Sequence, residues 1–268
     1  LAKVFQGPPA VHRYPGSMAA RTQAVCRLLV ERYGGRAENL WADAPDGATL
    51  LRRVGELPGF GAHILRRPFS VYAAKGDNVE IIYQTVGEGT AYLTEVETGA
   101  VCSLISPLGH GWQPSEGKSL IVGGGVGAAP LFMFTEQLVR EGREVEVVLG
   151  AQTASMMVTC DDYASLLGRD PIVATDDGSL GYAGFCTEPV REELARGDYS
   201  AVYCCGPTPL MRAVAAIAEE AGVPCWVSME KRMACGVGAC LSCVVETQAG
   251  KRRSCVDGPV FNAKELVW

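Results

Sequence analysis

No stretch of this sequence stays apolar over the roughly 18 residues that a membrane-spanning helix needs. Residues 1–20 also lack the apolar run behind a basic region that marks a secretory signal. Positive charge is not in excess, because 24 Lys and Arg stand against 30 Asp and Glu, for a net charge of −6. That balance is not the one expected of a nucleic-acid binder. We therefore expect a soluble, cytoplasmic protein with no membrane or nucleic-acid partner.

The positive charge that is present is concentrated at the start of the chain. Residues 1–61 hold eight Lys and Arg and five Asp and Glu, a net charge of +3, so the remaining residues carry −9. Such asymmetry indicates segments of different origin or with different partners. The length of 268 residues suggests two or three small domains.

The sequence has eleven cysteines and no secretory signal, so a disulfide framework is not expected. Four cysteines near the end follow the C-x4-C-x2-C…C spacing of plant-type [2Fe–2S] ferredoxins: Cys235, Cys240, Cys243 and Cys255. A glycine-rich loop at 236–239 would let the backbone wrap around a cluster. After a charged turn at 250–253, a hairpin could return Cys255 to the other three.

Structural zinc and four buried free thiols are the alternatives for these cysteines. Zinc sites favour two C-x-x-C pairs, and this segment has one. The other cysteines have no ligand spacing, and we expect most of them in the core: Cys26, Cys102, Cys160, Cys186, Cys204, Cys205 and Cys225.

A glycine-rich turn lies between a predicted strand and a predicted helix in the middle of the chain. The strand is expected at 119–123 and the helix from Leu131 onward, and the turn contains Gly123, Gly124, Gly125 and Gly127. Backbone N–H groups and a helix N-terminus in this setting can accept a pyrophosphate. A tight turn without a ligand is the alternative.

Further strands are predicted at 144–149, 171–175 and 201–204, with a helix at 210–221. This alternation indicates a parallel sheet covered on both faces by helices. A second turn, Cys205, Gly206 and Pro207, would lie with the first at the carboxyl edge, where such sheets bind ligands.

An extended basic and aromatic segment precedes this sheet: Arg67, Pro68, Phe69 and Ser70. A cation, a ring and a hydroxyl in one stretch suit a flavin and its pyrophosphate, and a plain edge strand is the alternative. A strand is predicted at 79–85 and a turn at Gly87, Gly89 and Thr90. We expect His110, in a glycine-rich loop, to be structural.

Taken in order, these motifs resemble the ferredoxin-reductase superfamily. Residues 67–70 resemble its flavin motif, and the two glycine turns resemble its nicotinamide-nucleotide signatures. Residues 229–243 and 255–261 are similar to electron-transfer subunits of class 1B dihydroorotate dehydrogenases. The resemblance implies an α/β plus β fold: a partial antiparallel flavin barrel, a parallel-sheet nucleotide-binding domain and a small C-terminal [2Fe–2S] domain. We expect them at 62–115, 116–222 and 223–268, after an atypical helical segment at 1–61.

The same resemblance implies FAD, one [2Fe–2S] cluster and NAD(H) as cofactors. It implies an FMN-containing catalytic partner that oxidises dihydroorotate in pyrimidine biosynthesis, assembled as a heterotetramer, and no catalytic acid or base in this subunit. It assigns the four clustered cysteines to iron and residues 67–70 to FAD. Weaker FAD candidates, placed by position, are Ile82, Tyr83, Gln84, Gly89 and Thr90.

The first 61 residues depart from that family. A barrel strand could begin at 3–7, but an amphipathic helix is predicted at 21–33, with short helical pieces at 40–44 and 48–54. Residues 22–61 resemble part of a helix-hairpin-helix DNA-repair domain, with the hairpin at 57–61. The second helix of that hairpin and the family's catalytic lysine and aspartate are absent.

Three other functions remain open on the sequence. The chain could be an electron-transfer subunit of a hydrogenase or transhydrogenase, which share these motifs. It could be a DNA-binding N-terminal module on an inactive redox scaffold, or a zinc-binding interaction protein.

The flavin motif gives the first testable prediction. Arg67→Ala should weaken FAD binding, because it removes the cation assigned to the pyrophosphate. Flavin released from the purified variant and quantified by absorbance is the measurement. Unchanged flavin occupancy would show that the motif is only a strand.

Overall fold

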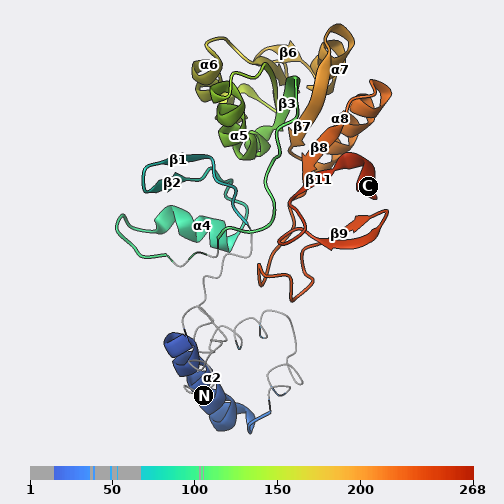
Figure 1. The fold of residues 1–268 in the computed structure, drawn as a ribbon. Helices are drawn as coiled ribbons and strands as arrows, with labels where there is room; N and C mark the ends of the chain where they lie inside the picture. The colour runs from blue at the N-terminus through green and yellow to red at the C-terminus, as the bar shows by residue number, and fades with distance from the viewer. Residues whose placement is uncertain are drawn as a thin grey trace. The chain divides into compact units, whose positions relative to one another are not determined.

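A seven-stranded sheet is the centre of this computed structural model, which describes residues 15–36, 39, 49, 53, 68–102, 104 and 106–268. The strands lie in the order β11-β8-β7-β3-β4-β5-β6 (Figure 1). Neighbours are parallel except for β11, which is antiparallel to β8. The strands are β3 (Lys118–Gly124), β4 (Val145–Ala151), β5 (Ile172–Thr175), β6 (Tyr182–Ala183), β7 (Tyr199–Cys205), β8 (Cys225–Ser228) and β11 (Val260–Asn262).

The central strands are apolar along their whole length because both faces of the sheet are covered. In β3, every residue from 119 to 124 is buried, and Leu120, Ile121 and Val122 are fully inaccessible. Strands buried on both faces read as continuous rather than alternating apolar runs. This explains why the sequence marks these strands so clearly.

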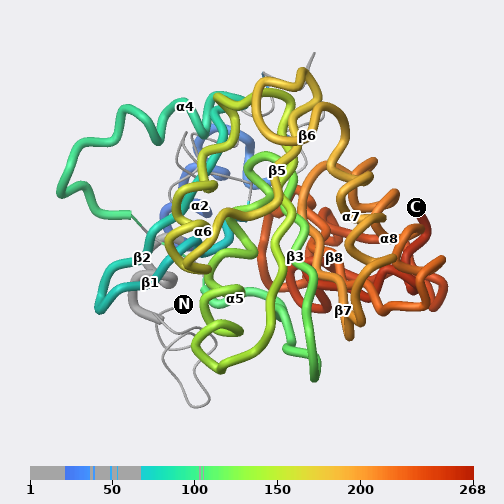
Figure 2. The backbone as a smooth tube through the Cα atoms, turned by 90° about the horizontal axis from the view of Figure 1, so that it is seen from above, coloured from blue at the N-terminus to red at the C-terminus, as the bar shows by residue number. Residues whose placement is uncertain are grey.

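Helices cover the two faces in pairs (Figures 1 and 2). One face packs α5 (Ala129–Arg140) and α6 (Cys160–Leu167) against Ile121, Val147 and Tyr203. The other packs α7 (Thr187–Arg196) and α8 (Thr208–Glu220) against side chains of opposite orientation, Leu120, Val148 and Val202 among them. Alternate residues of each strand therefore serve alternate cores.

The predicted parallel sheet is confirmed, and so are its strands at 119–123, 144–149, 171–175 and 201–204 and its helix at 210–221. The sheet extends further than expected. β8 and β11 come from the segment beyond residue 222. The C-terminal segment and the nucleotide-binding sheet therefore share strands.

Within the C-terminal segment, β9 (Val244–Thr247) and β10 (Gly250–Arg253) form an antiparallel hairpin. Residues 250–253, expected as a charged turn, are thus its second strand, because the chain reverses at 248–249. A short 3-10 helix, η4 (Ala263–Glu265), follows β11.

The segment before the sheet is less regular. Residues 68–72 are extended, and β1 (Ala73–Lys75) pairs antiparallel with β2 (Asn78–Glu80). The strand predicted at 79–85 is wrong beyond Glu80, since residues 81–86 pair with no strand. The turn predicted at Gly87, Gly89 and Thr90 is wrong as well. Helix α4 (Glu88–Glu95) begins there because the Thr90 hydroxyl accepts the N–H groups of Val86 (2.9 Å) and Gly87 (3.2 Å).

The chain divides into two units, residues 1–65 and 66–268. In the first, the structure describes α2 (Pro15–Tyr33), which confirms the helix predicted at 21–33. The strand start at 3–7 and the hairpin at 57–61 lie outside the described residues, as do the helical pieces predicted at 40–44 and 48–54, apart from residues 49 and 53. In the described part of the chain, no helix is long and apolar enough to cross a membrane.

The central strand gives a prediction about stability. Leu120→Ala should lower the free energy of unfolding by about 2–5 kcal/mol, because it opens a cavity between β3 and the helices α7 and α8. Urea denaturation followed by circular dichroism measures it. Val158→Ala is the control, since Val158 is exposed and its loss should cost less than ~0.5 kcal/mol. Equal effects for both variants would contradict this description of the core.

Candidate functional site

One cavity of about 850 Å³ lies at the carboxyl edge of the parallel sheet. Its lining begins where the strands end. Gly124 closes β3, Ala151 closes β4, Asp176 follows β5, Gly206 follows β7, and Glu230 stands two residues after β8. The parallel strands thus deliver residues far apart in sequence to one edge.

The two glycine turns meet at this edge. A Cβ on Gly127 would lie 2.6 Å from both the Cys205 carbonyl oxygen and the Gly206 Cα. A Cβ on Gly206 would lie 3.0 Å from the Gly124 Cα. The turns after β3 and β7 therefore pack backbone against backbone, and packing alone requires glycine at both positions.

Gly125 differs from these positions. Its φ is +55°, which favours glycine, and a Cβ there would meet nothing within 4 Å. The residue faces open space in the cavity, at the start of the 3-10 turn η2 (Gly125–Ala128) that leads into α5. With Pro130 in its first turn, α5 begins at the cavity wall. Backbone N–H groups at such a helix start are suited to a pyrophosphate.

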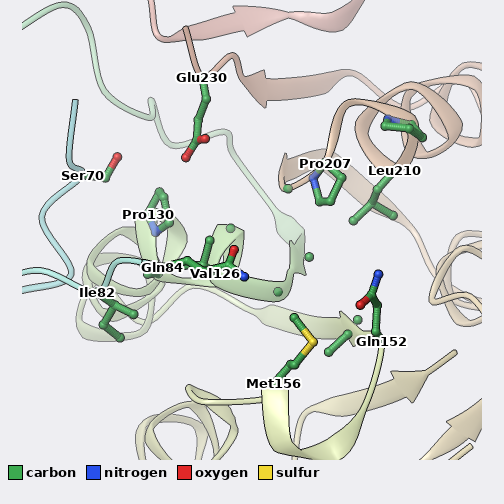
Figure 3. Close-up of a pocket in the computed structure, with 18 of the residues that line it drawn as sticks. Ser70, Ile82, Gln84, Val126, Pro130, Gln152, Met156, Pro207, Leu210 and Glu230 are labelled. Atoms are coloured by element: carbon green, nitrogen blue, oxygen red, sulfur yellow. The ribbon is translucent and has the colours of Figure 1, made fainter. Parts of the chain in front are cut away.

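The predicted flavin segment forms the opposite wall. Figure 3 shows Ser70 and Ile82 on one side of the cavity and Pro207 and Leu210 on the other, with Val126 between. The cavity brings together most of the predicted site residues: Pro68, Phe69, Ser70, Ile82, Tyr83, Gln84, Thr90, Gly124, Gly125, Gly127, Gly206 and Pro207.

Of the four other predicted site residues, three do not line the cavity and one lies outside the described residues. Gly89 is in the first turn of α4 and does not line the cavity, although its neighbour Thr90 does. Gly123 is the last but one residue of β3 and Cys205 is the last residue of β7, and neither lines the cavity. A Cβ on Gly123 would lie 2.7 Å from the Ala128 Cα. Arg67 lies outside the described residues.

Among the described lining residues, charge is sparse and balanced. The lining includes two carboxylates, Asp176 and Glu230, and two cations, Lys231 and Arg232. In Figure 3 the Glu230 carboxylate points into the cavity from the sheet side, as the Ser70 hydroxyl does from the flavin segment. Polar groups thus reach the cavity from both walls.

Two buried thiols at this edge stay neutral. Burial raises the pKa of Cys186, which lines the cavity, to about 11, and that of Cys205 to about 12. Both groups therefore act as small apolar side chains at neutral pH. Both were expected in the core, and both are buried.

The four clustered cysteines come together in two pairs. The Cys240 N–H donates to the Cys235 sulfur at 3.4 Å, and Cys243 and Cys255 pack together in one buried cluster. The hairpin produces the second pair, because Cys243 precedes β9, Cys255 follows β10, and the Ser254 N–H donates to the Cys243 carbonyl (2.9 Å). No three metal-binding side chains among the described residues converge on a single ion. Two pairs of thiols suit two irons.

The loop between the cysteines has the shape that a cluster requires. The N–H groups of Val237 and Cys240 both donate to the Cys235 sulfur at 3.4 Å. Gly236 and Gly238 have φ of +69° and +79°, and Arg253 donates to the Gly238 carbonyl (3.3 Å). Backbone N–H groups aimed at sulfur stabilise the thiolate form that iron binds.

The hydrogen bonds of the loop also act on one thiol directly. The pKa of the Cys240 thiol is lowered to about 6, first by hydrogen bonds with Ser242 and then by hydrogen bonds with Cys235. Burial raises the pKa of Cys255 instead. The exposed end of the loop therefore presents a ready thiolate, while the buried end is closed by the hairpin.

A short connection joins the cavity to this loop. Glu230 lines the cavity, and Cys235 follows five residues later. Buried Met233 packs with Cys243 and Cys255, and Leu108 from the loop before the sheet packs against them. The backbone N–H of His110 donates to the Gly258 carbonyl (2.5 Å), which ties the loop before the sheet to the segment after the cluster cysteines.

Comparison with known proteins agrees with this division of the molecule. Residues 230–267 match the iron–sulfur cluster binding domain of dihydroorotate dehydrogenase B, and residues 121–216 match the oxidoreductase NAD-binding domain. The dihydroorotate dehydrogenase B (NAD(+)) electron transfer subunit of Clostridium acetobutylicum is 37% identical over 205 residues, which are 76% of this chain and 80% of that one. This chain belongs to the dihydroorotate dehydrogenase B electron transfer subunit family. It is therefore an electron-transfer subunit of an oxidoreductase, as the motifs predicted.

Other relatives extend the match. The subunit of Desulforamulus reducens is 35% identical over 243 residues, or 84% of this chain and 90% of that one. A solved NADH-dependent reduced ferredoxin-NADP oxidoreductase, described for flavin-based electron bifurcation, has a TM-score of 0.67 and 31% identity, and the match covers 75% of this chain and 74% of that one. The family's C-terminal domain is an iron–sulfur domain, which removes the zinc alternative.

Several residues that line the cavity were not predicted from the sequence. The missed residues include Val126, Gly150, Gln152, Met156, Asp176, Phe185, Cys186, Thr187, Leu210 and the run 230–232. The sequence did hold a signal for Asp176, because this residue directly follows a predicted strand at the edge of the sheet where ligands bind. The sequence held no such signal for Phe185 and Thr187, because only the order of the strands in the sheet brings these residues to the cavity.

The contact between the turns gives a second stability prediction. Gly127→Ala should lower the free energy of unfolding by about 1–3 kcal/mol, because its Cβ has no room against Cys205 and Gly206. Gly111→Ala is the control, since a Cβ there meets nothing within 4 Å. Chemical denaturation of both variants is the measurement, and a Gly127→Ala variant as stable as the control would contradict the close approach.

Proposed function

We propose that this subunit carries electrons between the FMN of a dihydroorotate-oxidising catalytic partner and NAD, by way of one [2Fe–2S] cluster and FAD. This is a step of pyrimidine biosynthesis. When bound, the flavin exchanges electrons in pairs with the nicotinamide and singly with the cluster. The residues of this chain supply binding, orientation and exclusion of water.

The observation that carries the proposal is the composition of the cavity wall. The flavin segment, both glycine turns and the segment that leads to the cluster loop line one continuous space of about 850 Å³. A flavin ring and a nicotinamide must lie in contact for hydride transfer, and a single shared cavity allows this.

For the flavin, we assign residues 67–70 as the main contacts and Ile82, Tyr83, Gln84 and Thr90 as the wall beside them. The Phe69 and Tyr83 rings lie edge to face, with centroids 5.8 Å apart, and so form one aromatic surface. The Thr90 hydroxyl is engaged with the Gly87 carbonyl (3.0 Å). It therefore contributes shape to the wall more than a free donor.

For the nucleotide, we assign Gly124, Gly125, Gly127, Gly206 and Pro207. The open space above Gly125 and the start of α5 suit the pyrophosphate. The cluster is assigned to Cys235, Cys240, Cys243 and Cys255, two thiolates for each iron.

The catalytic partner would be an FMN-containing subunit, joined in a heterotetramer, and the complex would work in the cytoplasm. The curated relatives are named as electron transfer subunits, a name that presupposes such a partner. The bifurcating ferredoxin-NADP oxidoreductase favours one alternative, an electron-transfer subunit of a transhydrogenase. The two differ in the electron donor that reduces the cluster.

The experiment is anaerobic purification of the full chain, quantification of flavin and iron, and addition of NADH. We expect one flavin and two irons per chain, and bleaching of the cluster absorbance by NADH. Mixing with a dihydroorotate-oxidising FMN subunit and dihydroorotate should then reduce NAD+. Cofactor-loaded protein that takes no electrons from NADH would contradict the proposed route.

The cluster assignment gives its own prediction. Cys240→Ser should lose the [2Fe–2S] spectrum, because serine removes one of two thiolates on one iron. Iron analysis and visible absorbance measure the loss. Cys102→Ser is the matched control, since Cys102 is exposed and lacks ligand spacing. Two irons and a normal spectrum in Cys240→Ser would overturn the ligand assignment.

A further inference from the structure

A contact between the flavin segment and the nucleotide-binding sheet lies outside the cavity. Tyr72, two residues after Ser70, is buried, and its hydroxyl donates to the Asp162 carboxylate (2.5 Å) in the first turn of α6. Burial, followed by this hydrogen bond, raises the pKa of Tyr72. The phenol therefore stays protonated at neutral pH and can donate this hydrogen bond.

The Tyr72 ring packs on α5. It stacks on Phe132, with ring centroids 4.7 Å apart and planes at 27°, in a small apolar cluster with Ala73, Ala129 and Ile82. Ala129 and Ile82 also line the cavity. The contact thus lies directly behind the wall that both cofactors would share.

The packing continues to the phosphate-binding turn. Phe132 meets the Tyr163 ring edge to face at 5.1 Å, and the fully buried Tyr163 donates its hydroxyl to the Ala128 carbonyl (2.8 Å). Ala128 ends the glycine turn that follows β3. Three rings in contact therefore join the flavin segment to the turn assigned to the nucleotide.

We propose that the Tyr72–Asp162 hydrogen bond and the Tyr72–Phe132 stack form a latch that sets the position of the flavin segment relative to the nucleotide-binding turn. Tyr72 and Asp162 are positioning residues. They line no part of the cavity, and they act through Ser70 on one side and Ala128 on the other. The inference rests on the proposed function, in that the latch matters to activity only if both cofactors bind here.

The latch should affect rate more than binding. Hydride transfer requires donor and acceptor within about 3–3.5 Å, and a displacement of ~1 Å can cost ~100-fold. The groups assigned to NADH lie on the sheet, which does not depend on Tyr72. Loss of the latch should therefore lower the rate of flavin reduction by NADH and leave the KM for NADH unchanged.

Three variants of the full chain test this. Tyr72→Phe keeps the ring stack and removes the donor, and Asp162→Ala removes the acceptor. Asp162→Asn keeps an acceptor oxygen and should restore most of the function. Asp161→Ala is the matched control, because Asp161 is exposed in the same turn of α6. The measurements are flavin and iron content, stopped-flow flavin reduction by NADH, and hydrogen–deuterium exchange of residues 68–75.

We expect Tyr72→Phe and Asp162→Ala to exchange faster at 68–75, with unchanged exchange in β3 and β4. Flavin reduction should slow about tenfold at full flavin occupancy, and the double variant should be no slower than either single one. Unchanged exchange at 68–75 would overturn the latch. Faster exchange with a normal rate, or a rate loss matched by flavin loss, would overturn its positioning role.

These outcomes are separable from failure of the proposed function. If the unaltered chain binds no flavin or takes no electrons from NADH, the electron route is wrong. The exchange measurement still decides the latch in that case, because it needs neither cofactor.

Discussion

Backbone contact between two glycine turns determines where the rest of the site can be. Gly127 lies against Cys205 and Gly206 so closely that neither turn could carry a side chain there. The helices after these turns, α5 and α8, cover opposite faces of the sheet, so the edge between β3 and β7 opens outward. Ligands of open α/β sheets bind at such points. The flavin segment reaches this edge by packing on the start of α5, and the cluster loop reaches it through β8.

The short path from β8 to the cluster loop ties the iron site to the same edge. Because β8 is a strand of the main sheet, Glu230 enters the cavity wall on a rigid support, and Cys235 follows within five residues. The hairpin of β9 and β10 then closes Cys255 onto Cys243. Electron transfer needs short and constant distances between cofactors. Sharing strands between the two parts of the chain meets that need better than a flexible linker would.

Local signals predicted the parts of this architecture that local chemistry determines. Buried strands such as β3 read as apolar runs, the glycine turns follow from their spacing, and the cysteine spacing identifies the cluster family. The cavity's remaining lining depends on strand order, which no local pattern encodes: Asp176 and Glu230 converge only because β5 and β8 lie in one sheet. The helix at Glu88–Glu95 was missed because its glycines suggested a turn, whereas the Thr90 hydroxyl caps it. The hairpin at 57–61 lies outside the described residues, and its DNA-repair resemblance stays a prediction.

The two walls of the cavity are held by different forces. The nucleotide wall ends strands from the middle of a seven-stranded sheet, where ladder hydrogen bonds and two cores fix the backbone. The flavin wall belongs to an extended segment whose described strands, β1 and β2, pair only with each other. Nearby apolar side chains such as Val79 and Val101 are exposed, at 61% and 97%. No strand pairing among the described residues joins the flavin wall to the seven-stranded sheet, so side-chain contacts must hold it in place. The described residues provide these contacts in the three-ring cluster around Phe132. Among the described residues, the precision of the flavin side therefore depends on three packed rings and one hydrogen bond.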